Sequence, residues 1–325
     1  MKAVYFKKYG GPEVLQCGER PEPKVGRHDV LIEVHAAAVN PRDWLLREGR
    51  YFARHLIRSR PIIPGSDVSG TVLAIGSDVT KFQPGDAVFG MQSILGNMGG
   101  YAERIAINEE CLARKPSSVS HIGAAAIPVA GLTAWQALYD LAKITSGARV
   151  AIIGASGGVG HYAVQFARHT GAHITAVCSG KNADFVRDLG AHSVVDYTTD
   201  DIHAEITGVD VVFDTIGRES LSTCAHMMNP GGIYITTVPN LSNAREWVQS
   251  AVSAQINERR NVATTRGAIV LVKPRGDQLA EIIELMDAGM VRSSVDGLYP
   301  LCDAAEAHRQ SRTFRTRGKI VLQVK

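Results

Sequence analysis

The sequence predicts an α/β protein that combines a β-rich domain with a doubly wound parallel sheet. Two different residue patterns along the chain support this prediction. Residues 1–126 alternate short β-branched runs with glycine and proline, a pattern typical of a compact barrel-like β domain. Residues 127–274 alternate apolar strands with helical segments, a pattern typical of a parallel sheet with helices on both faces. A chain of 325 residues is long enough for two such domains.

The predicted elements are short strands in the first domain and strand–helix units in the second. In the first domain, strands are expected at 30–34, 70–75 and 86–89. In the second, strands are expected at 149–153, 173–177, 193–196, 209–213, 232–237 and 267–273, with helices at 159–170, 182–189 and 220–228. Met227 and Met228, at the end of the last helix, are interpreted as core packing.

Residues 275–325 form a third segment, which we expect to complete the first domain. An amphipathic helix is predicted at 278–287, and Gly289 ends it. A closing strand is predicted at 319–324, after the parallel sheet already has its strands. The chain is therefore expected to return to the β-rich domain.

The charge balance excludes some classes of partner. The chain has 35 Lys and Arg residues against 32 Asp and Glu residues, and its formal net charge is +3. This balance gives no electrostatic reason to expect a nucleic-acid or membrane partner. The amino-terminal residues lack the apolar run of a signal peptide, and no apolar stretch approaches the roughly 20 residues of a membrane helix.

The cysteines are few and scattered, and none belongs to a CxxC pair. The five are Cys17, Cys111, Cys178, Cys224 and Cys302. An odd number at irregular spacing predicts neither a disulfide framework nor a zinc ribbon. Because free thiols indicate a reducing compartment, we expect a cytoplasmic protein.

A glycine-rich segment at 150–160, Val-Ala-Ile-Ile-Gly-Ala-Ser-Gly-Gly-Val-Gly, joins an apolar strand to an amphipathic helix. It matches the pattern G-x-G-x-x-G with Ala155 in place of the first glycine, and a second strand–helix unit follows. Gly157 would let the backbone approach a pyrophosphate, and Gly160 would let the helix pack closely on the strand. The N–H groups at the helix start would then face the phosphates. The segment therefore predicts dinucleotide binding by a Rossmann-type sheet.

The same residues also match G-x-S-x-G, the nucleophile elbow of α/β-hydrolases, with Ser156 as the nucleophile. Asp214 and His226 follow in the chain order of a Ser-Asp-His triad. However, no HGGG-type oxyanion loop precedes the serine, His226 is predicted inside a helix, and Gly160 would have no role. These features favour dinucleotide binding, with the hydrolase as the alternative.

The end of the second strand predicts which dinucleotide binds. NAD-specific folds place an Asp or Glu there, about 20 residues past the loop, to bind the ribose hydroxyls. Here the strand runs into Cys178-Ser179-Gly180-Lys181, which contains no carboxylate. A hydroxyl and an ammonium group suit the 2′-phosphate of NADPH, which a carboxylate would repel. Ser179 and Lys181 therefore predict NADPH; the alternative roles are a helix cap and a solvated surface residue.

Four motifs occur in order along the chain: Asn-Pro-Arg-Asp at 40–43, Pro-Gly-Ser-Asp-Val-Ser-Gly at 64–70, the loop at 154–160, and Ala-Ala-Glu-Ala-His at 304–308 followed by Gly-Lys-Ile-Val-Leu at 318–322. With these motifs the chain resembles the quinone oxidoreductase (zeta-crystallin-like) branch of the medium-chain dehydrogenase/reductase superfamily. The likeness covers essentially the whole chain. It implies a GroES-like catalytic domain at 1–126, a Rossmann NADPH-binding domain at 127–274 and a return segment at 275–325.

The resemblance also bears on metal binding. Zinc-containing relatives carry Cys at the position of Asn40, His-Glu at Ser66 and Asp67, and a further cysteine near 129–130. Relatives with a structural zinc carry a four-cysteine lobe, and the corresponding residues 90–101 contain no cysteine. Catalytic zinc needs three protein ligands and structural zinc usually four, so we expect no metal site.

The resemblance implies positions for the cofactor. The pyrophosphate would be held by Ser156, Gly157, Gly158 and Val159. The 2′-phosphate would be surrounded by Ser179, Lys181 and Tyr197. The nicotinamide would be framed by Asn40, Tyr51 and the loop Val238-Pro239-Asn240. The alternatives are an aromatic cap on the sheet for Tyr197 and a partly exposed loop position for Tyr51.

The implied activity is NADPH-dependent hydride transfer without zinc. Without a Lewis acid, the expected substrates are those that conjugation already activates, namely quinones and α,β-unsaturated carbonyl compounds. Hydrogen-bond donors aimed at the conjugated oxygen would assist, and Asn40 and Tyr51 are the candidate positioning residues. Trp44 is interpreted as wall or core, and the basic loop 54–60 as a solvated loop.

Two further expectations concern turnover and assembly. Relatives of this kind include lens crystallins, so an NADPH-binding structural or regulatory protein without turnover is the second functional hypothesis. Residues 267–273 are predicted as the edge strand of the cofactor sheet. Because an exposed edge can pair with its own copy across a two-fold axis, we expect a homodimer.

Overall fold

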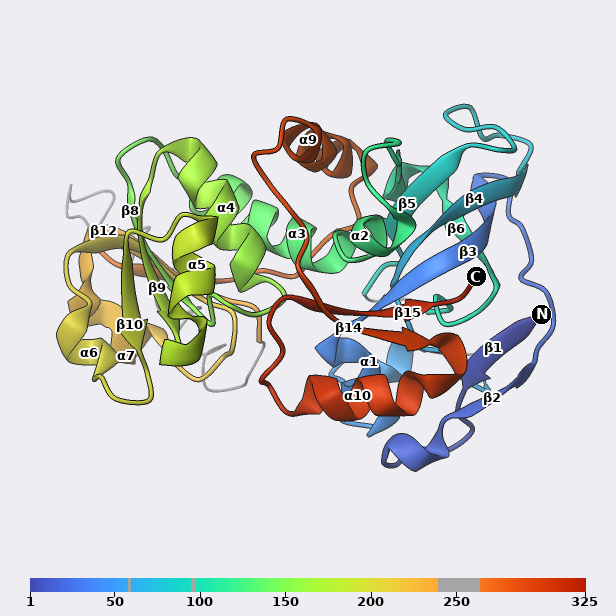
Figure 1. Cartoon of the computed structure of the whole chain (residues 1–325), viewed down its shortest axis with the longest axis horizontal. Coiled ribbons are helices and arrows are strands. Elements are labelled where there is room, and N and C mark those ends of the chain that lie inside the picture. The colour runs from blue at the N-terminus through green and yellow to red at the C-terminus, as the bar shows by residue number, and fades with distance from the viewer. Residues whose placement is uncertain (58–59, 95–97, 239–263) are drawn as a thin grey trace. The chain divides into compact units, whose positions relative to one another are not determined.

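The structure is a computed structural model of the 325-residue chain, and it describes residues 1–57, 60–94, 98–238 and 264–325. The chain divides into two compact units, of which the first comprises Met1–Leu132 and Val272–Lys325 and the second Thr133–Leu271 (Figure 1). These boundaries lie near the ranges predicted from the sequence and do not coincide with them.

A seven-stranded sheet dominates the first unit, in the order β14-β15-β3-β4-β5-β7, with β6 paired to β3. The strands are β3 (Asp29–Val39), β4 (Asp67–Ile75), β5 (Ala87–Met91), β6 (Arg104–Asn108), β7 (Leu112–Arg114), β14 (Val295–Pro300) and β15 (Lys319–Gln323). A separate hairpin joins β1 (Lys2–Tyr5) and β2 (Gln16–Glu19). The helices of this unit are α1 (Pro41–Arg47), α2 (His121–Ala125), α9 (Gly276–Asp287) and α10 (Ala304–Arg312). Helix α3 (Pro128–Trp135) begins in this unit and ends in the second. The short 3-10 turns are η1 (Pro12–Val14), η2 (Arg54–Leu56), η3 (Glu109–Cys111) and η7 (Leu301–Asp303).

The carboxyl-terminal segment belongs to the core of the first unit. Strand β15 pairs antiparallel with β3, with Ile320 opposite Val39, so both chain ends lie in this unit (Figure 1). Alternating burial along β3 directs Val30 and Ile32 inward. They share one apolar cluster with Leu301 and with side chains of α10 and β15. The last residues of the chain therefore complete the core that the first residues begin.

The second unit is a six-stranded parallel sheet in the order β10-β9-β8-β11-β12-β13. Its strands are β8 (Arg149–Ile153), β9 (His173–Cys178), β10 (Ser193–Asp196), β11 (Val209–Asp214), β12 (Met228–Thr236) and β13 (Arg266–Ile269). Among its described residues the helices are α4 (Gly160–Thr170), α5 (Ala183–Leu189), α6 (Ile202–Glu205) and α7 (Leu221–Cys224), with a π-helical turn η4 (Gln136–Leu141) and 3-10 turns η5 (Gly180–Asn182) and η6 (Ala225–Met227). Numbered within the unit, this is the 3-2-1-4-5-6 order of doubly wound nucleotide-binding sheets, with the switch point beside β8. The predicted fold class is confirmed.

One predicted helix is wrong. The prediction of a helix over 220–228 fails because α7 ends at Cys224, a 3-10 turn follows, and Met228 already begins β12. The Pro230-Gly231 pair suggests a turn before the strand, but the structure accommodates it within β12, where the pairing with β11 shifts register. Strands β8 and β10 have the predicted bounds.

The expectation of no disulfide is also wrong. Cys17 on β2 and Cys302 on η7 form a disulfide, and their Cα atoms are 5.3 Å apart. The two residues are separated by 285 positions in the sequence, and only the tertiary return of the chain brings them together. Cys111, Cys178 and Cys224 are free.

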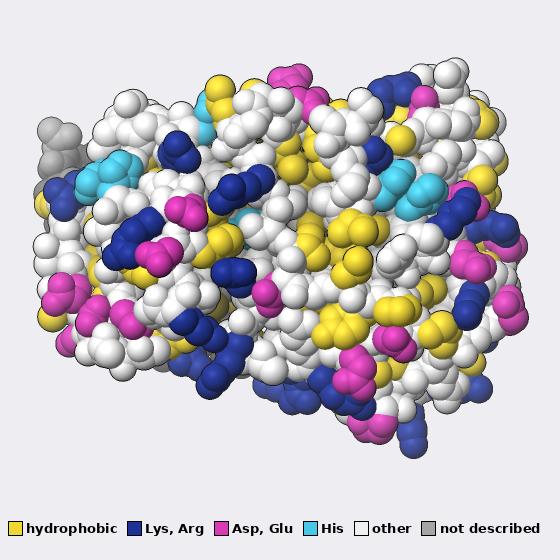
Figure 2. All heavy atoms as spheres, in the orientation of Figure 1, with side chains coloured by type: hydrophobic (Ala, Val, Ile, Leu, Met, Phe, Trp, Pro, Cys, Tyr) yellow, Lys and Arg dark blue, Asp and Glu magenta, His cyan; other side chains and the backbone are white. Residues whose placement is uncertain are grey.

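The surface carries charges of both signs. Figure 2 shows basic and acidic side chains interspersed on this face, in keeping with the small net charge. Within the described residues, no helix combines the length and the apolar character that a bilayer crossing requires.

Candidate functional site

The loop between β8 and α4 makes its tight turn at Gly154. This residue has a φ of 81°, and a Cβ placed on it would lie 2.5 Å from Thr215 Oγ1. The sequence pattern assigns the first glycine position to Ala155, whereas the left-handed turn falls one residue earlier. The positive φ explains why glycine stands at the end of the strand.

The two later glycines have different surroundings. A Cβ on Gly160 would lie 2.2 Å from Gly154 O and 2.7 Å from Ala155 Cα, so its absence lets α4 pack against the loop. A Cβ on Gly157 would meet only Gly154 O, at 3.3 Å, a tight contact that a small shift of the loop would relieve, so the protein crowds this position less than Gly160. A glycine with few protein neighbours on this loop is what close approach of a ligand to the backbone requires.

Backbone donors at the loop are available for an anion. The N–H of Gly157 donates to Gly154 O at 3.0 Å. The N–H groups of Ser156, Gly158 and Val159 donate to no acceptor in the described part of the chain. They precede the first turn of α4, where the helix dipole also favours negative charge. This arrangement can cradle a diphosphate.

Asn182 connects the loop to the tip of β9, and sequence reasoning missed it. Its Nδ2 donates to Ser156 Oγ at 3.1 Å and to Ser179 Oγ at 3.3 Å. The predicted pyrophosphate loop and the predicted 2′-phosphate position are therefore neighbours on the same edge of the sheet. An Asn four residues past a strand end, facing a serine on the first loop, is the signal that could have revealed it.

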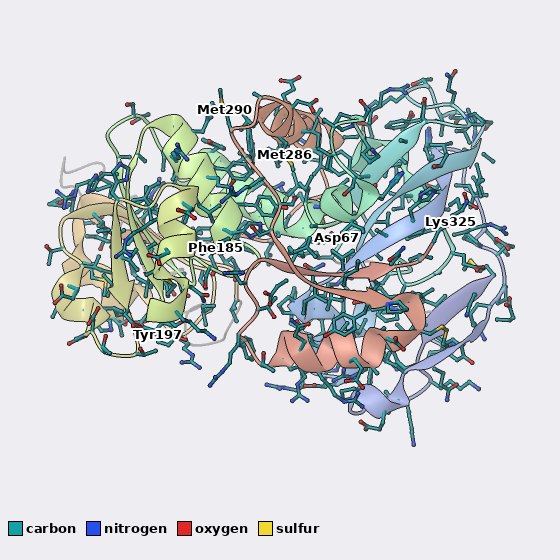
Figure 3. All side chains as sticks on the ribbon, in the orientation of Figure 1. Asp67, Phe185, Tyr197, Met286, Met290 and Lys325 are labelled. Atoms are coloured by element: carbon teal, nitrogen blue, oxygen red, sulfur yellow. A yellow bond between two sulfur atoms is a disulfide. The ribbon has the colours of Figure 1, made fainter. Side chains whose placement is uncertain are left out.

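Lys181 and Tyr197 complete this edge of the second unit. Lys181 is exposed on η5. Tyr197, labelled in Figure 3, is 57% exposed just after β10, and its N–H donates to Cys178 O at 3.3 Å. Asp196 ends β10 and lies beside this edge, because a Cβ on Gly180 would lie 2.3 Å from its Oδ2; its Oδ1 accepts from Thr198 N at 3.0 Å and Oγ1 at 2.7 Å. No carboxylate stands at the end of β9 itself, as the sequence shows.

The loops after β11 and β12 form the other side of the switch point. Asp214 is fully buried, and its carboxylate accepts from the N–H groups of Ile216 and Gly217, both at 2.8 Å. Val238 is 37% exposed and packs against Gly217, where a Cβ would lie 2.4 Å from the Val238 Cβ. Pro239, predicted to bind the cofactor, lies outside the described residues, as does Asn240.

Ser156, Asp214 and His226 do not form the triad that the hydrolase hypothesis requires. Ser156 Oγ accepts from Asn182, and His226 Nε2 pairs with His203 O at 3.1 Å. Asp214 is occupied by backbone N–H groups of its own loop. Each of the three side chains that a triad would need is held by a different partner.

A buried polar cluster surrounds Asn40 in the first unit. Asn40 is 4% exposed at the start of α1; its Nδ2 donates to Asp67 Oδ2 at 2.9 Å, and its Oδ1 accepts from Lys319 Nζ at 2.6 Å. Lys319 Nζ is also 3.5 Å from Asp67 Oδ2. Asp67, labelled in Figure 3, is fully buried and accepts from Val129 N at 2.9 Å. Burial raises the pKa of Asp67 and lowers that of Lys319, and the ion pair between them opposes both shifts.

A second chain of hydrogen bonds reaches Asn40 through Asp43. Arg47 Nη1 can only donate, so His308 Nδ1 accepts from it at 3.0 Å and the neutral ring carries its proton on Nε2. That Nε2 donates to Tyr101 Oη at 3.2 Å, and the Tyr101 hydroxyl donates to Asp43 Oδ2 at 3.0 Å. Asp43 Oδ2 also accepts from the Asn40 N–H at 2.8 Å, which fixes the start of α1.

Burial shifts the titration of both ends of this chain. It raises the pKa of Asp43 to about 6, and Asp43 Oδ1 has no hydrogen-bond partner among the described residues. Burial, with the charge of Arg47, lowers the pKa of His308 to about 3. At neutral pH the imidazole is therefore uncharged, and the carboxylate depends on Tyr101 and Asn40 for its stabilisation.

The other two candidates in the first unit are already engaged. Tyr51 is 5% exposed; its hydroxyl donates to Ile94 O at 2.8 Å, and the Arg42 guanidinium lies 5.2 Å from its ring centre. Trp44 is also 5% exposed, and its indole N–H donates to Ser311 Oγ at 3.2 Å, in keeping with a wall or core role. Arg42 also donates to the Tyr51 oxygen, so this hydroxyl has no free proton and one lone pair left to offer.

Comparison with known proteins agrees with these features. Residues 26–117 match the alcohol dehydrogenase GroES-like domain, and residues 189–322 match the zinc-binding dehydrogenase family. The chain is 32% identical to the chloroplast envelope quinone oxidoreductase homolog of Arabidopsis thaliana, over 99% of this chain and 98% of the relative. The chain belongs to the quinone oxidoreductase-like branch of the medium-chain dehydrogenase/reductase superfamily.

Solved structures of the superfamily have the same fold. The quinone oxidoreductase of Coxiella burnetii has a TM-score of 0.87 and 29% identity, with 100% of this chain and 99% of that chain covered. A mycobacterial protein solved in complex with NADPH has a TM-score of 0.82 and 27% identity, with both chains covered completely.

The name of the zinc-binding dehydrogenase family raises the question of a metal. At the predicted ligand positions stand the Asn40 amide, the Ser66 hydroxyl and the Asp67 carboxylate, and all three are bonded within the protein; Ser66 Oγ accepts from Arg42 Nη1 at 2.6 Å. Among the described residues, no group of three or more His, Cys, Asp or Glu side chains could hold a metal ion. Zinc prefers thiolate and imidazole ligands, so this donor set does not fit it.

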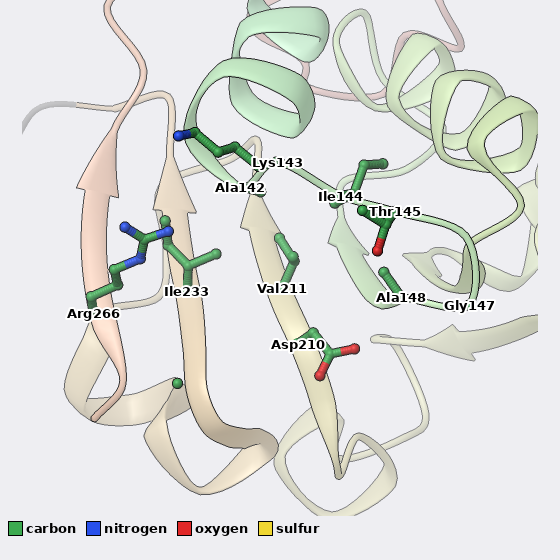
Figure 4. A pocket seen from close by; sticks show the side chains of 11 residues that line it. Ala142, Lys143, Ile144, Thr145, Gly147, Ala148, Asp210, Val211, Ile233 and Arg266 are labelled. Carbon is green, nitrogen blue, oxygen red and sulfur yellow. The ribbon is translucent and has the colours of Figure 1, made fainter. Parts of the chain in front are cut away.

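The second unit also contains a cavity of about 360 Å³, which lies away from the glycine loop at 154–160. It is lined by Lys143 and Arg266, together with Asp210 at the start of β11 (Figure 4). These residues lie at the amino ends of the strands, whereas dinucleotides bind beyond the carboxyl ends of such sheets. The cavity is therefore not the candidate cofactor site.

Proposed function

We propose that this protein is an NADPH-dependent oxidoreductase that reduces quinones or α,β-unsaturated carbonyl compounds without zinc. The observation that carries the proposal is the Asn182 bridge between Ser156 and Ser179. It places a glycine loop with free N–H donors beside a strand tip whose own residues, 178–181, include no carboxylate, with Asp196 of β10 lying against Gly180. The loop suits the diphosphate of a dinucleotide, and the strand tip suits an additional phosphate on the ribose.

The choice of NADPH over NADH follows from charge. Ser179 offers a hydroxyl and Lys181 an exposed ammonium group where NAD-specific sheets carry an acid. Tyr197, exposed beside them, can cover the adenine side of the site. The proposal is supported by the mycobacterial structure that contains NADPH and by relatives named NAD(P)H oxidoreductase.

When bound, NADPH supplies the hydride. The protein then has to orient the acceptor and stabilise the negative charge that collects on its conjugated oxygen. We assign Asn40 to positioning, because Lys319 and Asp67 hold its carboxamide in one orientation and leave one amide N–H for a ligand. Tyr51 contributes a wall and an acceptor, since its proton is given to Ile94. Water remains the proton source.

The substrate class is supported by chemistry and by the names of relatives. The donor set at the positions of Asn40, Ser66 and Asp67 does not fit a Lewis-acidic zinc, so a substrate already polarised by conjugation needs the least assistance. Relatives such as the Arabidopsis protein are named quinone oxidoreductase homologs. A structural or regulatory protein that binds NADPH without turnover is the second candidate.

A direct assay separates these functions. Oxidation of NADPH is measured at its near-ultraviolet absorbance with 1,4-benzoquinone and with a simple enone as acceptors, beside NADH as the alternative coenzyme. We expect turnover with NADPH and at least one acceptor. Tight NADPH binding without turnover on either acceptor would identify the non-catalytic alternative, and no binding of either coenzyme would refute the proposal.

Assembly and location are proposed from the fold. The last strand of the described sheet, β13, has one neighbour, β12, and we propose that its other edge pairs with a second copy to form a homodimer. Sedimentation at the monomer mass at micromolar concentration would contradict this. We also propose a cytoplasmic location, which fractionation tests directly, together with the redox state of Cys17 and Cys302 in freshly opened cells.

A further inference from the structure

Two of the five cysteines stand exposed on the surface of the first unit as a pair. Cys17 lies on β2 opposite Val4 of β1, and Cys302 lies on η7 directly after Leu301. Val4 and Leu301 are 1% and 5% exposed and belong to the same apolar cluster. The backbones that carry the two sulfur atoms are therefore held near each other by core packing, independently of the disulfide.

The other three thiols are protected by the fold. Burial raises the pKa of Cys178 to about 11 and that of Cys224 to about 12. Compared with an ordinary cysteine, their thiolate fractions at neutral pH are roughly 100-fold and 1,000-fold lower. Cys111 is half-buried, and burial together with Glu110 raises its pKa as well.

This distribution matters because the proposed substrates are electrophiles. A thiolate adds to the conjugated carbon of a quinone: a sulfur–carbon bond forms, and the electron pair moves to one oxygen, which takes a proton from water. The ring proton on the attacked carbon then leaves and the second oxygen is protonated, which gives a hydroquinone thioether. The step needs no oxidant or reductant. A sulfur atom in a disulfide has no thiolate to contribute, so a closed Cys17–Cys302 pair cannot react in this way.

We propose that Cys17 and Cys302 are the covalent modification site of this protein for quinones and enones, and that their disulfide is the state that protects it. The substrate class in this inference rests on the proposed function. In the open state the pair offers two exposed thiols, and in the closed state it offers none. Closure by a small-molecule disulfide such as glutathione disulfide converts the two protein thiols to the bond and releases two glutathione thiols.

The test compares the closed and open forms of the full-length protein. One sample is kept oxidised, and the other is reduced with dithiothreitol and desalted; both are then exposed to 1,4-benzoquinone. Peptide mass spectrometry locates the adducts. We expect adducts on the Cys17 and Cys302 peptides of the open form, at least about 100-fold faster than on Cys178 or Cys224, and none on these two peptides in the closed form.

Cysteine variants and a second electrophile test whether the adduct positions depend on misfolding or on turnover. Cys17→Ser leaves Cys302 permanently open and should be modified there without reduction, whereas Cys17→Ser/Cys302→Ser should resist modification, and Cys111→Ser should behave like the wild type. Iodoacetamide, which accepts no hydride, provides a second electrophile for the same positions. Adducts mainly on other cysteines, or equal labelling of the closed and open forms, would overturn the proposal.

The same preparations separate this inference from the proposed function. NADPH oxidation with benzoquinone is assayed in the Cys17→Ser/Cys302→Ser variant, which has no exposed thiol to lose. Absent turnover with the expected adduct map would refute the proposed function alone. Normal turnover with unmodified Cys17 and Cys302 in the open form would refute the modification site alone.

Discussion

Lys319 Nζ donates to Asn40 Oδ1 at 2.6 Å, and this bond joins β15 to the residue that caps the start of α1. Lys319 is 4% exposed, and Asp67 beside it is fully buried. A buried cation and a buried anion thus hold the amide of Asn40 from both sides. The orientation of this amide depends on residues 279 positions apart in the sequence.

Replacing Lys319 tests how much the Lys319–Asp67 ion pair contributes to the stability of the protein. Lys319→Met leaves the Asp67 carboxylate buried without its cation, so we expect a loss of about 3–5 kcal/mol in the free energy of unfolding, measured with denaturant. Lys319→Met/Asp67→Asn removes both charges and should recover most of it. The matched control is Lys325→Met, whose exposed pair with Glu33 should contribute less than about 1 kcal/mol. Equal effects of the two single variants would contradict this.

His308 predicts a pH dependence. Its pKa in the folded protein, about 3, is below the unfolded value of 6.5, so the unfolded chain takes up the proton first as the pH falls. Stability should therefore decrease from pH 6.5 toward pH 3, by up to about 5 kcal/mol from this residue. His308→Gln, which does not titrate, should show a smaller decrease in chemical unfolding series across this range. Parallel curves for the two proteins would show that His308 does not contribute.

Asp43 should act in the opposite direction. Its folded pKa of about 6 exceeds the unfolded value of 3.8, so protonation favours the folded state as the pH falls between these values. The contribution is about 3 kcal/mol at most. Asp43→Asn removes it, and the amide oxygen can still accept from Tyr101. The stability difference between wild type and variant should therefore grow in favour of the wild type from pH 6.5 to pH 4; a constant difference would argue against the raised pKa.

The two glycines of the loop should separate binding from folding. A Cβ on Gly157 would meet only Gly154 O, at 3.3 Å, so Gly157→Ala should lower the unfolding midpoint less than Gly160→Ala does and weaken NADPH binding by about tenfold or more, because the methyl group blocks the ligand. Gly160→Ala forces the methyl group against backbone and should destabilise the protein by about 1–3 kcal/mol. Calorimetric binding and thermal unfolding measure the two effects. Unchanged NADPH affinity in Gly157→Ala would remove this loop from the site.

Ser179 should control coenzyme preference. Ser179→Asp places a carboxylate at the end of β9, where it can accept from ribose hydroxyls and repel a 2′-phosphate. We expect NADPH affinity to fall about 10- to 100-fold while NADH affinity is kept or improved. Ser193→Asp, at the amino end of β10, is the control with the same change of charge. A similar response of both coenzymes to Ser179→Asp would contradict the assignment.

The local pattern predicted those elements whose boundaries are set locally. Strands β8 and β10 have the predicted bounds because each is a short apolar run limited by polar or glycine residues. The end of the 220–228 segment was not predictable in this way, since Met228 joins β12 through its pairing with Val209 on β11. Tertiary pairing, rather than helical periodicity, decided that boundary.

In the candidate site, too, some residues could be predicted from local sequence and others only from tertiary contacts. Ser156, Gly157 and Ser179 follow from a loop and a strand end that the sequence displays, whereas Asn182, Lys319 and the Cys17–Cys302 bond depend on contacts across the fold. A lysine in an apolar closing strand gave no local signal of its partner. Only the return of the chain to β3 places it beside Asn40.

The position of β15 between β14 and β3 has a consequence for biosynthesis. Residues 133–271 form a contiguous unit that can fold as it leaves the ribosome, but the first unit needs the final strand. Until β15 has been synthesised, the Ala36–Val39 stretch of β3 lacks this partner, and its backbone is open to other strands. We therefore expect the first unit to complete its folding only after β15 is available.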